Sequence, residues 1–137
     1  MANYQRGPGD IEWNNVVAEV FARDVNRCRA QRVFRVAEWQ EFKMHAPRAL
    51  IATLDPAHVI PASKAGHMVY DVDNVVVMNR WSHDNLDHNR SPVNGKNLTK
   101  EEVHQWWARI VGVEKYKELL MRASRGPAME EKNADNE

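Results

Sequence analysis

Apolar residues recur at helical spacing near the start of the chain. After the loop sequence GPGD, apolar side chains follow one another at intervals of three and four residues, and Asp10 stands where the N-cap of a helix is expected. The stripe consists of Trp13, Val16, Val17, Val20 and Phe21, and it should face the core. A second helix is predicted over residues 32–45. It should end before Pro47, because a residue that precedes proline disfavours the helical conformation.

The same spacing returns near the C-terminus. Thr99 and Glu102 are placed as in a capping box, so a helix should begin there. Its apolar positions are Val103, Trp106, Trp107 and Ile110. Gly112 interrupts the pattern, and residues 113–123 predict a last amphipathic helix. The helical spacing favours core packing of the two tryptophans over a role as a stacking surface for nucleic acid bases.

Between these helices the pattern changes to short extended runs. Residues 57–60 (AHVI) and 74–78 (NVVVM) predict two strands joined by a polar connection that contains a glycine. Residues 48–54 indicate an extended or mixed segment. A short helix should begin near Asn79 and end at Pro92 and Gly95. Helices on both sides of two strands predict an α+β fold.

Composition bounds the class of protein. The chain has 137 residues, of which 43% are hydrophobic and 28% charged, and this balance predicts one globular domain. We place that domain at residues 1–125 and expect residues 126–137 to form a disordered acidic tail. No apolar run approaches the roughly 18 residues that cross a bilayer, and the first ten residues lack the apolar centre of a secretory signal. We therefore expect a cytoplasmic protein without membrane contact.

The single cysteine and the charge distribution limit the chemistry further. Cys28 alone can form neither an internal disulfide nor a cysteine-rich zinc site, so it should be a buried or idle thiol. The net charge is zero, which gives no overall attraction to a polyanion. Five arginines nevertheless cluster around Asp24, namely Arg23, Arg27, Arg29, Arg32 and Arg35. This cluster predicts either a solvated helix face or a contact with the DNA backbone.

Four of the six histidines lie between residues 54 and 88. His58 is presented from an otherwise apolar strand. On the following helix His83 and Asp87 are four residues apart and share a face, so together they can bind one cation. Asp84 and His88 have the same spacing on an adjacent face. Spacing alone does not choose between the two pairs.

The order AHVIP, DN and SHDNLD resembles the His-Asn-His motif of the HNH endonucleases, the ββα-metal or His-Me finger nucleases, over residues 54–92. The resemblance implies a ββα-metal finger wrapped by N- and C-terminal helices. It implies His58 as the general base, Asn74 as the catalytic-site residue that braces the loop, and His83 with Asp87 as metal ligands. The implied function is a metal-dependent endonuclease that hydrolyses DNA phosphodiester bonds.

These residue types suit phosphodiester hydrolysis. Histidine, with an ordinary pKa of about 6.5, can take a proton from water near neutral pH, and a divalent ion neutralises the charge that develops on the phosphate. The amide of Asn74 can keep His58 aimed, although an ordinary turn asparagine fits the spacing equally well. Mg²⁺ or Mn²⁺ suits one carboxylate with a water shell, and the imidazole makes Ni²⁺ or Zn²⁺ usable as well.

Two features depart from the family pattern. Many relatives carry an aspartate ligand immediately before the first histidine, where this chain has Ala57, and Asp55 is the candidate substitute. The Cys-x-x-Cys knuckles common in the superfamily are replaced by Asn79 and Ser82. We therefore expect no structural zinc, and packing by the flanking helices must hold the finger together.

The resemblance implies DNA as the partner. It also implies a phage or mobile-element protein that acts in a bacterial host and has other proteins of that element as candidate partners. The alternative is a catalytically silent nucleic-acid-binding or packaging accessory that keeps the HNH scaffold, which Ala57 and the neutral net charge favour. A third candidate, a small metal-binding interaction domain unrelated to nucleic acid, depends on the net charge alone.

Overall fold

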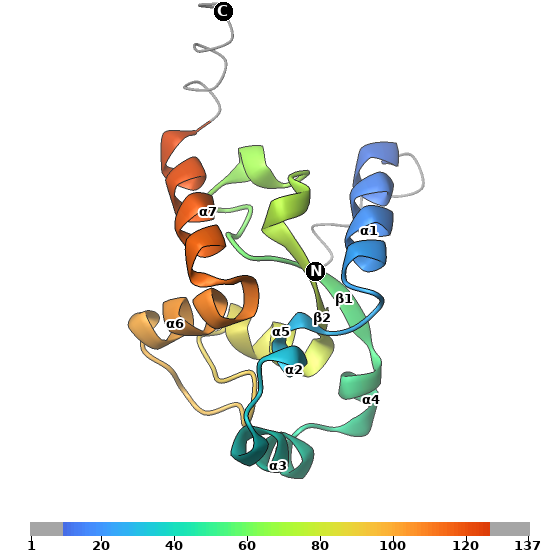
Figure 1. Cartoon of the computed structure of the whole chain (residues 1–137), viewed down its shortest axis with the longest axis vertical. Coiled ribbons are helices and arrows are strands. Elements are labelled where there is room, and N and C mark those ends of the chain that lie inside the picture. The colour runs from blue at the N-terminus through green and yellow to red at the C-terminus, as the bar shows by residue number, and fades with distance from the viewer. Residues whose placement is uncertain (1–9, 127–137) are drawn as a thin grey trace, which may run out of the picture.

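A small antiparallel hairpin surrounded by helices makes up the described part of the chain, residues 10–126 of the computed structural model (Figure 1). The hairpin consists of β1 (Leu54–His58) and β2 (Val75–Asn79). The helices are α1 (Ile11–Arg23), α2 (Arg29–Arg32), α3 (Val36–His45), α4 (Arg48–Ala52), α5 (Arg80–Asp87), α6 (Lys100–Val111) and α7 (Val113–Arg125). Helices and a sheet occur together, so the predicted α+β class is confirmed.

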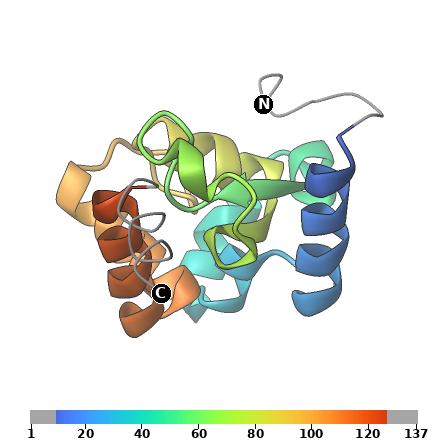
Figure 2. The ribbon, with the colours of Figure 1, turned by 90° about the horizontal axis from the view of Figure 1, so that it is seen from above.

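Helices from the two ends of the chain cover opposite faces of the hairpin. Successive residues of a strand point to opposite sides. Val75 and Val77 therefore pack with the buried stripe of α1, whereas Val76 and Met78 join a larger core to which α6 and α7 contribute. Figure 2 shows α1 and α7 on opposite sides of the molecule with the hairpin between them. The predicted packing of flanking helices around the two strands is confirmed.

A buried carboxylate joins α1 to β2. Asp24 is 1% exposed, and its Oδ2 accepts a hydrogen bond of 2.9 Å from the Val77 backbone N–H. Arg23 and Arg29 donate to the same carboxylate, and Arg32 donates to the Asp24 backbone carbonyl. Burial raises the pKa of Asp24, but these hydrogen bonds outweigh it and hold the pKa below its ordinary value. Three of the five clustered arginines are thus used within the fold.

The first strand begins earlier than predicted, at Leu54 rather than at residue 57. Pro56 is tolerated in it because it stands opposite Val77, whose N–H is directed away from β1 toward Asp24. Past His58, the side chain of Asn74 binds both backbone groups of Ile60 in place of a ladder. Because the strand begins at Leu54, Asp55 lies inside it.

The helix predicted over residues 32–45 begins only at Val36, and Arg32 belongs to a separate short helix. α2 ends at Arg32, and α3 begins at Val36, where the Glu38 side chain accepts from the Arg35 backbone N–H. The break turns Phe34 inward, where its ring packs edge-on against Trp39 and Trp106. Long-range aromatic packing therefore overrides the local helical pattern. The end of α3 at His45, before the proline, agrees with the prediction.

Residues 48–54 are the mixed segment that was one of the two alternatives. Residues 48–52 form α4, where the carbonyl of Pro47 accepts from the N–H groups of Leu50 and Ile51, and β1 begins at Leu54. The predicted end of the helix that follows β2 is wrong. α5 ends at Asp87, before Pro92. It ends there because Asn89 has a left-handed backbone (φ 57°) and the Arg90 N–H returns to the carbonyl of Asn85.

The remaining predictions about helices and packing are confirmed. Asp10 caps α1, and Thr99 and Glu102 form the capping box of α6. Trp107 is buried, and Trp106 is partly buried beneath the guanidinium of Arg109, 4.2 Å from the ring centroid. The thiol of Cys28 is buried. None of the helices within residues 10–126 is long and apolar enough for a membrane span. The predicted tail, residues 126–137, lies outside the described residues except for Gly126.

Candidate functional site

Asp55, His83 and Asp87 form a row that joins β1 to α5, and we call it the Asp-His-Asp row. Asp55 Oδ2 lies 3.1 Å from His83 Nδ1, and Asp87 Oδ2 lies 3.2 Å from His83 Nε2. The imidazole is therefore held between two carboxylates, one at each ring nitrogen. Helical i,i+4 spacing brings His83 and Asp87 together, and the strand register carries Asp55 to the beginning of α5.

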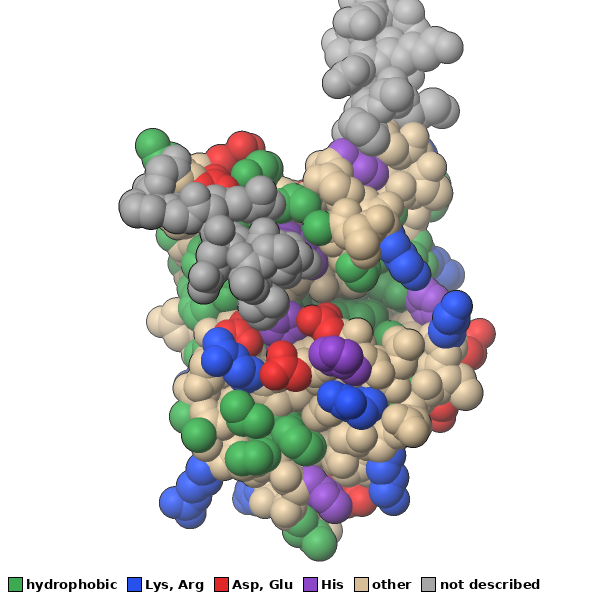
Figure 3. All heavy atoms as spheres, turned by 180° about the vertical axis from the view of Figure 1, so that it is seen from behind, with side chains coloured by type: hydrophobic (Ala, Val, Ile, Leu, Met, Phe, Trp, Pro, Cys, Tyr) green, Lys and Arg blue, Asp and Glu red, His purple; other side chains and the backbone are tan. Residues whose placement is uncertain are grey.

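The row leads from the interior to the surface. The side chains of Asp55 and His83 are 7% and 2% exposed, whereas that of Asp87 is 44% exposed. At the inner end Arg80, the first residue of α5, donates to both carboxylate oxygens of Asp55 at 2.8 and 3.2 Å. Figure 3 shows acidic, basic and histidine side chains side by side on the back of the molecule, where α5 lies.

The contacts within the row shift two pKa values in opposite directions. Burial lowers the pKa of His83, but the hydrogen bonds to Asp55 and Asp87 outweigh burial and raise it to about 9. Burial raises the pKa of Asp55, but the hydrogen bonds from His83 and Arg80 outweigh it and lower the pKa to about 2. Near neutral pH, His83 is therefore an imidazolium and Asp55 a carboxylate.

The outer end of the row has the chemistry of a cation site. If a metal ion replaces the proton on His83 Nε2, Nδ1–H still donates to Asp55, and carboxylates commonly orient metal-bound histidines in this way. Asp87 can then share the ion with Nε2, whereas Asp55 faces the other ring nitrogen. Within residues 10–126, no three His, Cys, Asp or Glu side chains surround one point suited to a metal. The donor set fits an ion that keeps waters or substrate oxygens in its shell.

The second pair that the spacing allowed is not brought together in the same way. His88 is exposed, and its Nδ1 lies 2.7 Å from the backbone carbonyl oxygen of Asp84. The ring therefore bonds to the helix backbone, and no ion pair joins it to the Asp84 carboxylate. Of the two pairs, His83 and Asp87 are the one whose side chains converge.

His58 ends β1, and its side chain points to the face opposite Asp55. The ring is stacked on Trp13 of α1, with ring centroids 5.3 Å apart and planes at 20°, and His58 is 4% exposed. Nε2 lies 2.9 Å from the carbonyl oxygen of Val69. A carbonyl only accepts, so Nε2 donates to it, and whenever the ring is neutral Nδ1 is the nitrogen that carries the lone pair. This tautomer directs any base chemistry to Nδ1.

Asn74 ties the connection between the strands back to the hairpin. It is fully buried, and its Oδ1 accepts from the Ile60 N–H at 2.8 Å. Its Nδ2 donates to the carbonyl oxygens of Ile60 at 3.0 Å and Met68 at 3.3 Å. Since Met68 precedes the residue that binds His58, the amide fixes the segment that orients the imidazole. This is the arrangement expected of a bracing residue.

The role of Asp55, the Arg80 contact and the Trp13 stack were not foreseen from the sequence. Asp55 is a candidate metal ligand by its position in the sequence, and in the structure its carboxylate accepts from Arg80 and contacts His83. Alternation along a strand that starts at Leu54 places Asp55 on the same face as Ala57, toward the helix that follows β2. The predicted strand began at residue 57 and did not include Asp55. For the stacking of Trp13 on His58 the sequence carries no local signal, because the two residues belong to distant elements.

Comparisons with models of protein families, with characterised proteins and with solved structures found no match for this chain. Any functional assignment therefore depends on the chemistry of the residues themselves.

Proposed function

We propose that this chain is a metal-dependent endonuclease of the HNH, or ββα-metal, type that hydrolyses DNA phosphodiester bonds. The observation that carries the proposal is the Asp-His-Asp row, in which a buried carboxylate contacts Nδ1 of the His83 ring and a half-exposed carboxylate lies 3.2 Å from Nε2. His83 and Asp87 lie on the helix that directly follows a two-stranded hairpin, and the first strand of that hairpin ends in His58. These elements occur in the order that the HNH motif requires.

His83 Nε2 and Asp87 would hold the divalent ion, and Asp55 would orient the imidazole from the other side. Two protein ligands leave room for waters and phosphate oxygens, which suits Mg²⁺ or Mn²⁺, and the imidazole also permits Ni²⁺ or Zn²⁺. A bound ion would supply Lewis-acid stabilisation of the phosphate and of the departing 3′ oxygen. Arg80 keeps Asp55 ionised, so that Asp55 continues to accept from His83 Nδ1–H.

His58 would act as the general base through Nδ1, because Nε2 is committed to the Val69 carbonyl. Trp13 limits rotation of the ring, and Asn74 fixes the loop that carries Val69. Both contacts hold the imidazole in one orientation without touching the reacting phosphate. Trp13 and Asn74 therefore serve as positioning residues.

One observation favours a second candidate. His58 is only 4% exposed, and a general base must reach a water molecule beside the substrate. A protein that keeps the scaffold but not the reaction would be a nucleic-acid-binding or packaging accessory. The absence of an acidic ligand at Ala57 favours the same candidate.

Cleavage of supercoiled plasmid separates the two functions. With Mn²⁺ we expect conversion of the plasmid to nicked or linear forms, and a chelator should stop it. His58→Ala should abolish cleavage while leaving Mn²⁺ affinity nearly unchanged, since the base need not hold the ion. Asp87→Asn should reduce both, and Asp84→Asn is the matched control. Plasmid binding without cleavage by the wild-type protein, with Mg²⁺, Mn²⁺, Ni²⁺ and Zn²⁺ each tried, would establish the accessory function instead.

A further inference from the structure

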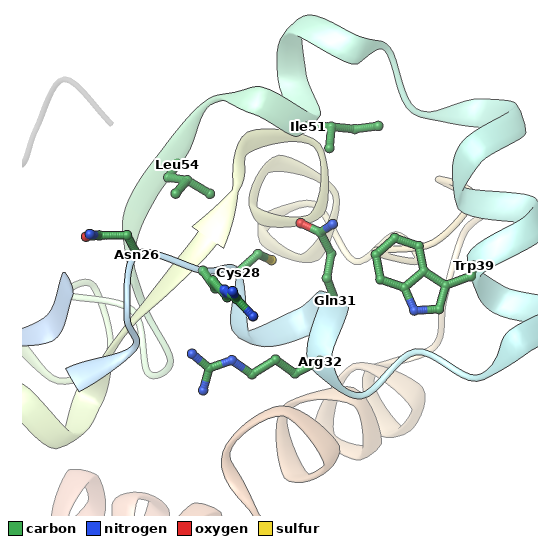
Figure 4. Close-up of a pocket in the computed structure, with 8 residues that line it drawn as sticks. Asn26, Cys28, Gln31, Arg32, Trp39, Ile51 and Leu54 are labelled. Carbon is green, nitrogen blue, oxygen red and sulfur yellow. The ribbon is translucent and has the colours of Figure 1, made fainter. Parts of the chain in front are cut away.

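A pocket of about 380 Å³ opens beside the hairpin, on the side of α2 and apart from the Asp-His-Asp row (Figure 4). Its wall runs from the turn after α1 through α2 and is completed by Trp39 of α3, Ile51 of α4 and Leu54 of β1. Leu54 is the chain neighbour of Asp55. The pocket is of a size that holds a small organic ligand, and none of the contacts proposed for cleavage uses it.

One amide in this pocket has a fixed orientation. The Ser82 backbone N–H donates to Asn79 Oδ1 at 2.8 Å. This contact fixes which end of the Asn79 amide is oxygen, so Nδ2 points away from Ser82 N. Nδ2 donates to Gln31 Oε1 at 3.1 Å. Gln31 therefore presents its NH₂ group to the pocket, and Figure 4 shows this nitrogen on the side of Trp39. The pocket thus offers the Gln31 NH₂ group as a donor to a ligand. Asn79, the N-cap of α5, holds that amide in its orientation.

The charge at the rim is positive. Arg27 and Arg32 line the pocket, and no acidic side chain is among the described residues that do so. The nearest carboxylate in sequence, Asp24, is already bound by Arg23 and Arg29. Arg32 donates to the Asp24 backbone carbonyl, so Arg27 is the guanidinium at the rim to which an anionic group can bind, and its planar shape suits bidentate binding to phosphate.

Trp39 supplies a flat apolar wall. Its ring is held edge-on by Phe34 and Phe42, with interplanar angles of 77° and 89°. Ile51 and Leu54 add apolar surface to the same pocket. An indole, a donor amide and a guanidinium group are together the chemistry that recognises a nucleobase with a phosphate attached.

We propose that this pocket binds one unpaired nucleotide of the nucleic acid. The base lies against Trp39, a carbonyl oxygen of the base accepts from the Gln31 amide, and the backbone phosphate binds Arg27. Since only donors face the ligand from these residues, a base with carbonyl acceptors, such as thymine, is preferred. The inference builds on the proposed function and narrows its substrate class to DNA with a single-stranded or unpaired nucleotide, because a base stacked in a duplex cannot enter a pocket.

Binding can be measured without cleavage. The probe is a fluorescently labelled single-stranded oligothymidylate, its affinity is measured by fluorescence anisotropy in the presence of a chelator, and an abasic oligonucleotide of equal length is the reference. Wild-type protein should bind the thymidylate about tenfold more tightly than the abasic strand, as expected when a base stacks on an aromatic side chain. Equal affinity for the two strands would overturn the proposal.

Two pairs of variants locate the contact. Gln31→Glu keeps an oxygen for Asn79 but replaces the donor with a charged acceptor, so it should remove the preference for thymidylate. Gln105→Glu makes the same chemical change at an exposed position of α6 and should not. Arg27→Glu should weaken binding of both strands about tenfold and reduce its salt dependence, whereas the exposed Arg125→Glu should change affinity less than twofold. Equal effects within either pair would place the bound strand elsewhere.

These results are independent of the nuclease proposal. Thymidylate binding through Gln31 and Arg27 in a protein that cleaves no plasmid would support the pocket and refute the endonuclease. Plasmid cleavage by the wild type, together with equal thymidylate binding by Gln31→Glu and Gln105→Glu, would support the endonuclease and refute the pocket. Thermal unfolding of each variant, compared with the wild type, shows whether any loss of binding comes from loss of the fold.

Discussion

Asp24 and Asp55 are two buried aspartates that bind arginine and contact the hairpin, yet they differ in what lies beyond them. Asp24 is surrounded by donors from within the fold, namely Arg23, Arg29 and the Val77 N–H. Beyond them the two arginines donate, within the described residues, only to backbone carbonyls, those of Val72, Val75 and Ile110. Asp55 binds a half-exposed arginine on one side and an imidazole on the other. From that imidazole the contacts continue to Asp87 at the surface.

The difference separates a structural charge from a candidate functional one. A buried carboxylate that is saturated by fixed donors can only hold elements together, and Asp24 joins α1, α2 and β2 in this way. A carboxylate whose partner is a titratable ring can influence what that ring binds. Burial and a lowered pKa are common to both residues, so neither property alone identifies the site.

The largest expected effect is on stability, from Asp24→Asn. The substitution leaves Arg23 and Arg29 without their buried counter-charge, and breaking a buried ion pair by removing one partner typically costs about 3–5 kcal/mol. Urea unfolding followed by circular dichroism measures the loss. Metal affinity of the folded fraction should be unchanged. A free energy of unfolding within about 1 kcal/mol of the wild type would remove the distinction between the two aspartates.

Asp55→Asn should cost less stability but alter the site. Arg80 is 45% exposed and can be rehydrated when the charge is removed, so we expect a loss of about 1–3 kcal/mol. Without the carboxylate, the pKa of His83 should fall, and affinity for Mn²⁺ should drop about 10- to 100-fold, as when other orienting carboxylates of metal-bound histidines are changed. Calorimetric titration with Mn²⁺ is the measurement. Unaltered affinity would show that the imidazole needs no orienting partner.

The fold could be predicted where local rules decide, and less well where distant residues do. The caps of α1 and α6 and the spacing of His83 and Asp87 are contained in a few consecutive residues, and these were predicted. The position of Asp55 depends on a strand that starts at Leu54 and passes through a proline, which the local pattern disfavours but Asp24 permits by binding the Val77 N–H. The break at residues 33–35 depends likewise on aromatic partners far along the chain.

The arginine cluster shows the same limit. Sequence alone left a solvated face and a DNA contact as alternatives, because it does not reveal that Asp24 is buried. Once Asp24 is inside, Arg23, Arg29 and Arg32 are bound by it. Of the five arginines, Arg27 and Arg35 are therefore left as candidates for a DNA contact. Of these two, Arg27 lines the pocket described above.

Titration offers a test that separates the Asp-His-Asp row from Asp24. The pKa of His83 is raised from 6.5 to about 9 in the folded protein. In metal-free protein the stability that this shift contributes is fully present below pH 6.5 and is lost as the pH rises through 9. The lowered pKa of Asp55 contributes stability above pH 3.8, and this is lost as the pH falls toward 2. Urea unfolding across this range should show both losses, and His83→Asn should lack the alkaline one.

Metal binding should respond to the same proton. The ion must displace the hydrogen from His83 Nε2, so Mn²⁺ affinity should increase about tenfold per pH unit until the pH reaches the pKa of His83, near 9. Release of one proton per bound ion at neutral pH, measured in buffers of different ionisation enthalpy, checks the mechanism. Binding that is independent of pH would mean that the ion does not contact His83.

The smallest change in stability is expected at the outer end of the row, where Asp87 and Asp84 provide a matched pair on one helix. Asp87→Asn removes a contact of 3.2 Å from a side chain that is 44% exposed, so the free energy of unfolding should change by less than about 1 kcal/mol. Its Mn²⁺ affinity should nevertheless fall about tenfold or more, because the amide is a weaker ligand than a carboxylate. Asp84→Asn carries the same loss of charge on the same helix, but no ion pair joins Asp84 to His83 or His88, and both quantities should remain at the wild-type values. If Asp84→Asn weakened Mn²⁺ binding as much as Asp87→Asn, the effect would come from the general charge of α5, and the Asp-His-Asp row would not be a specific metal site.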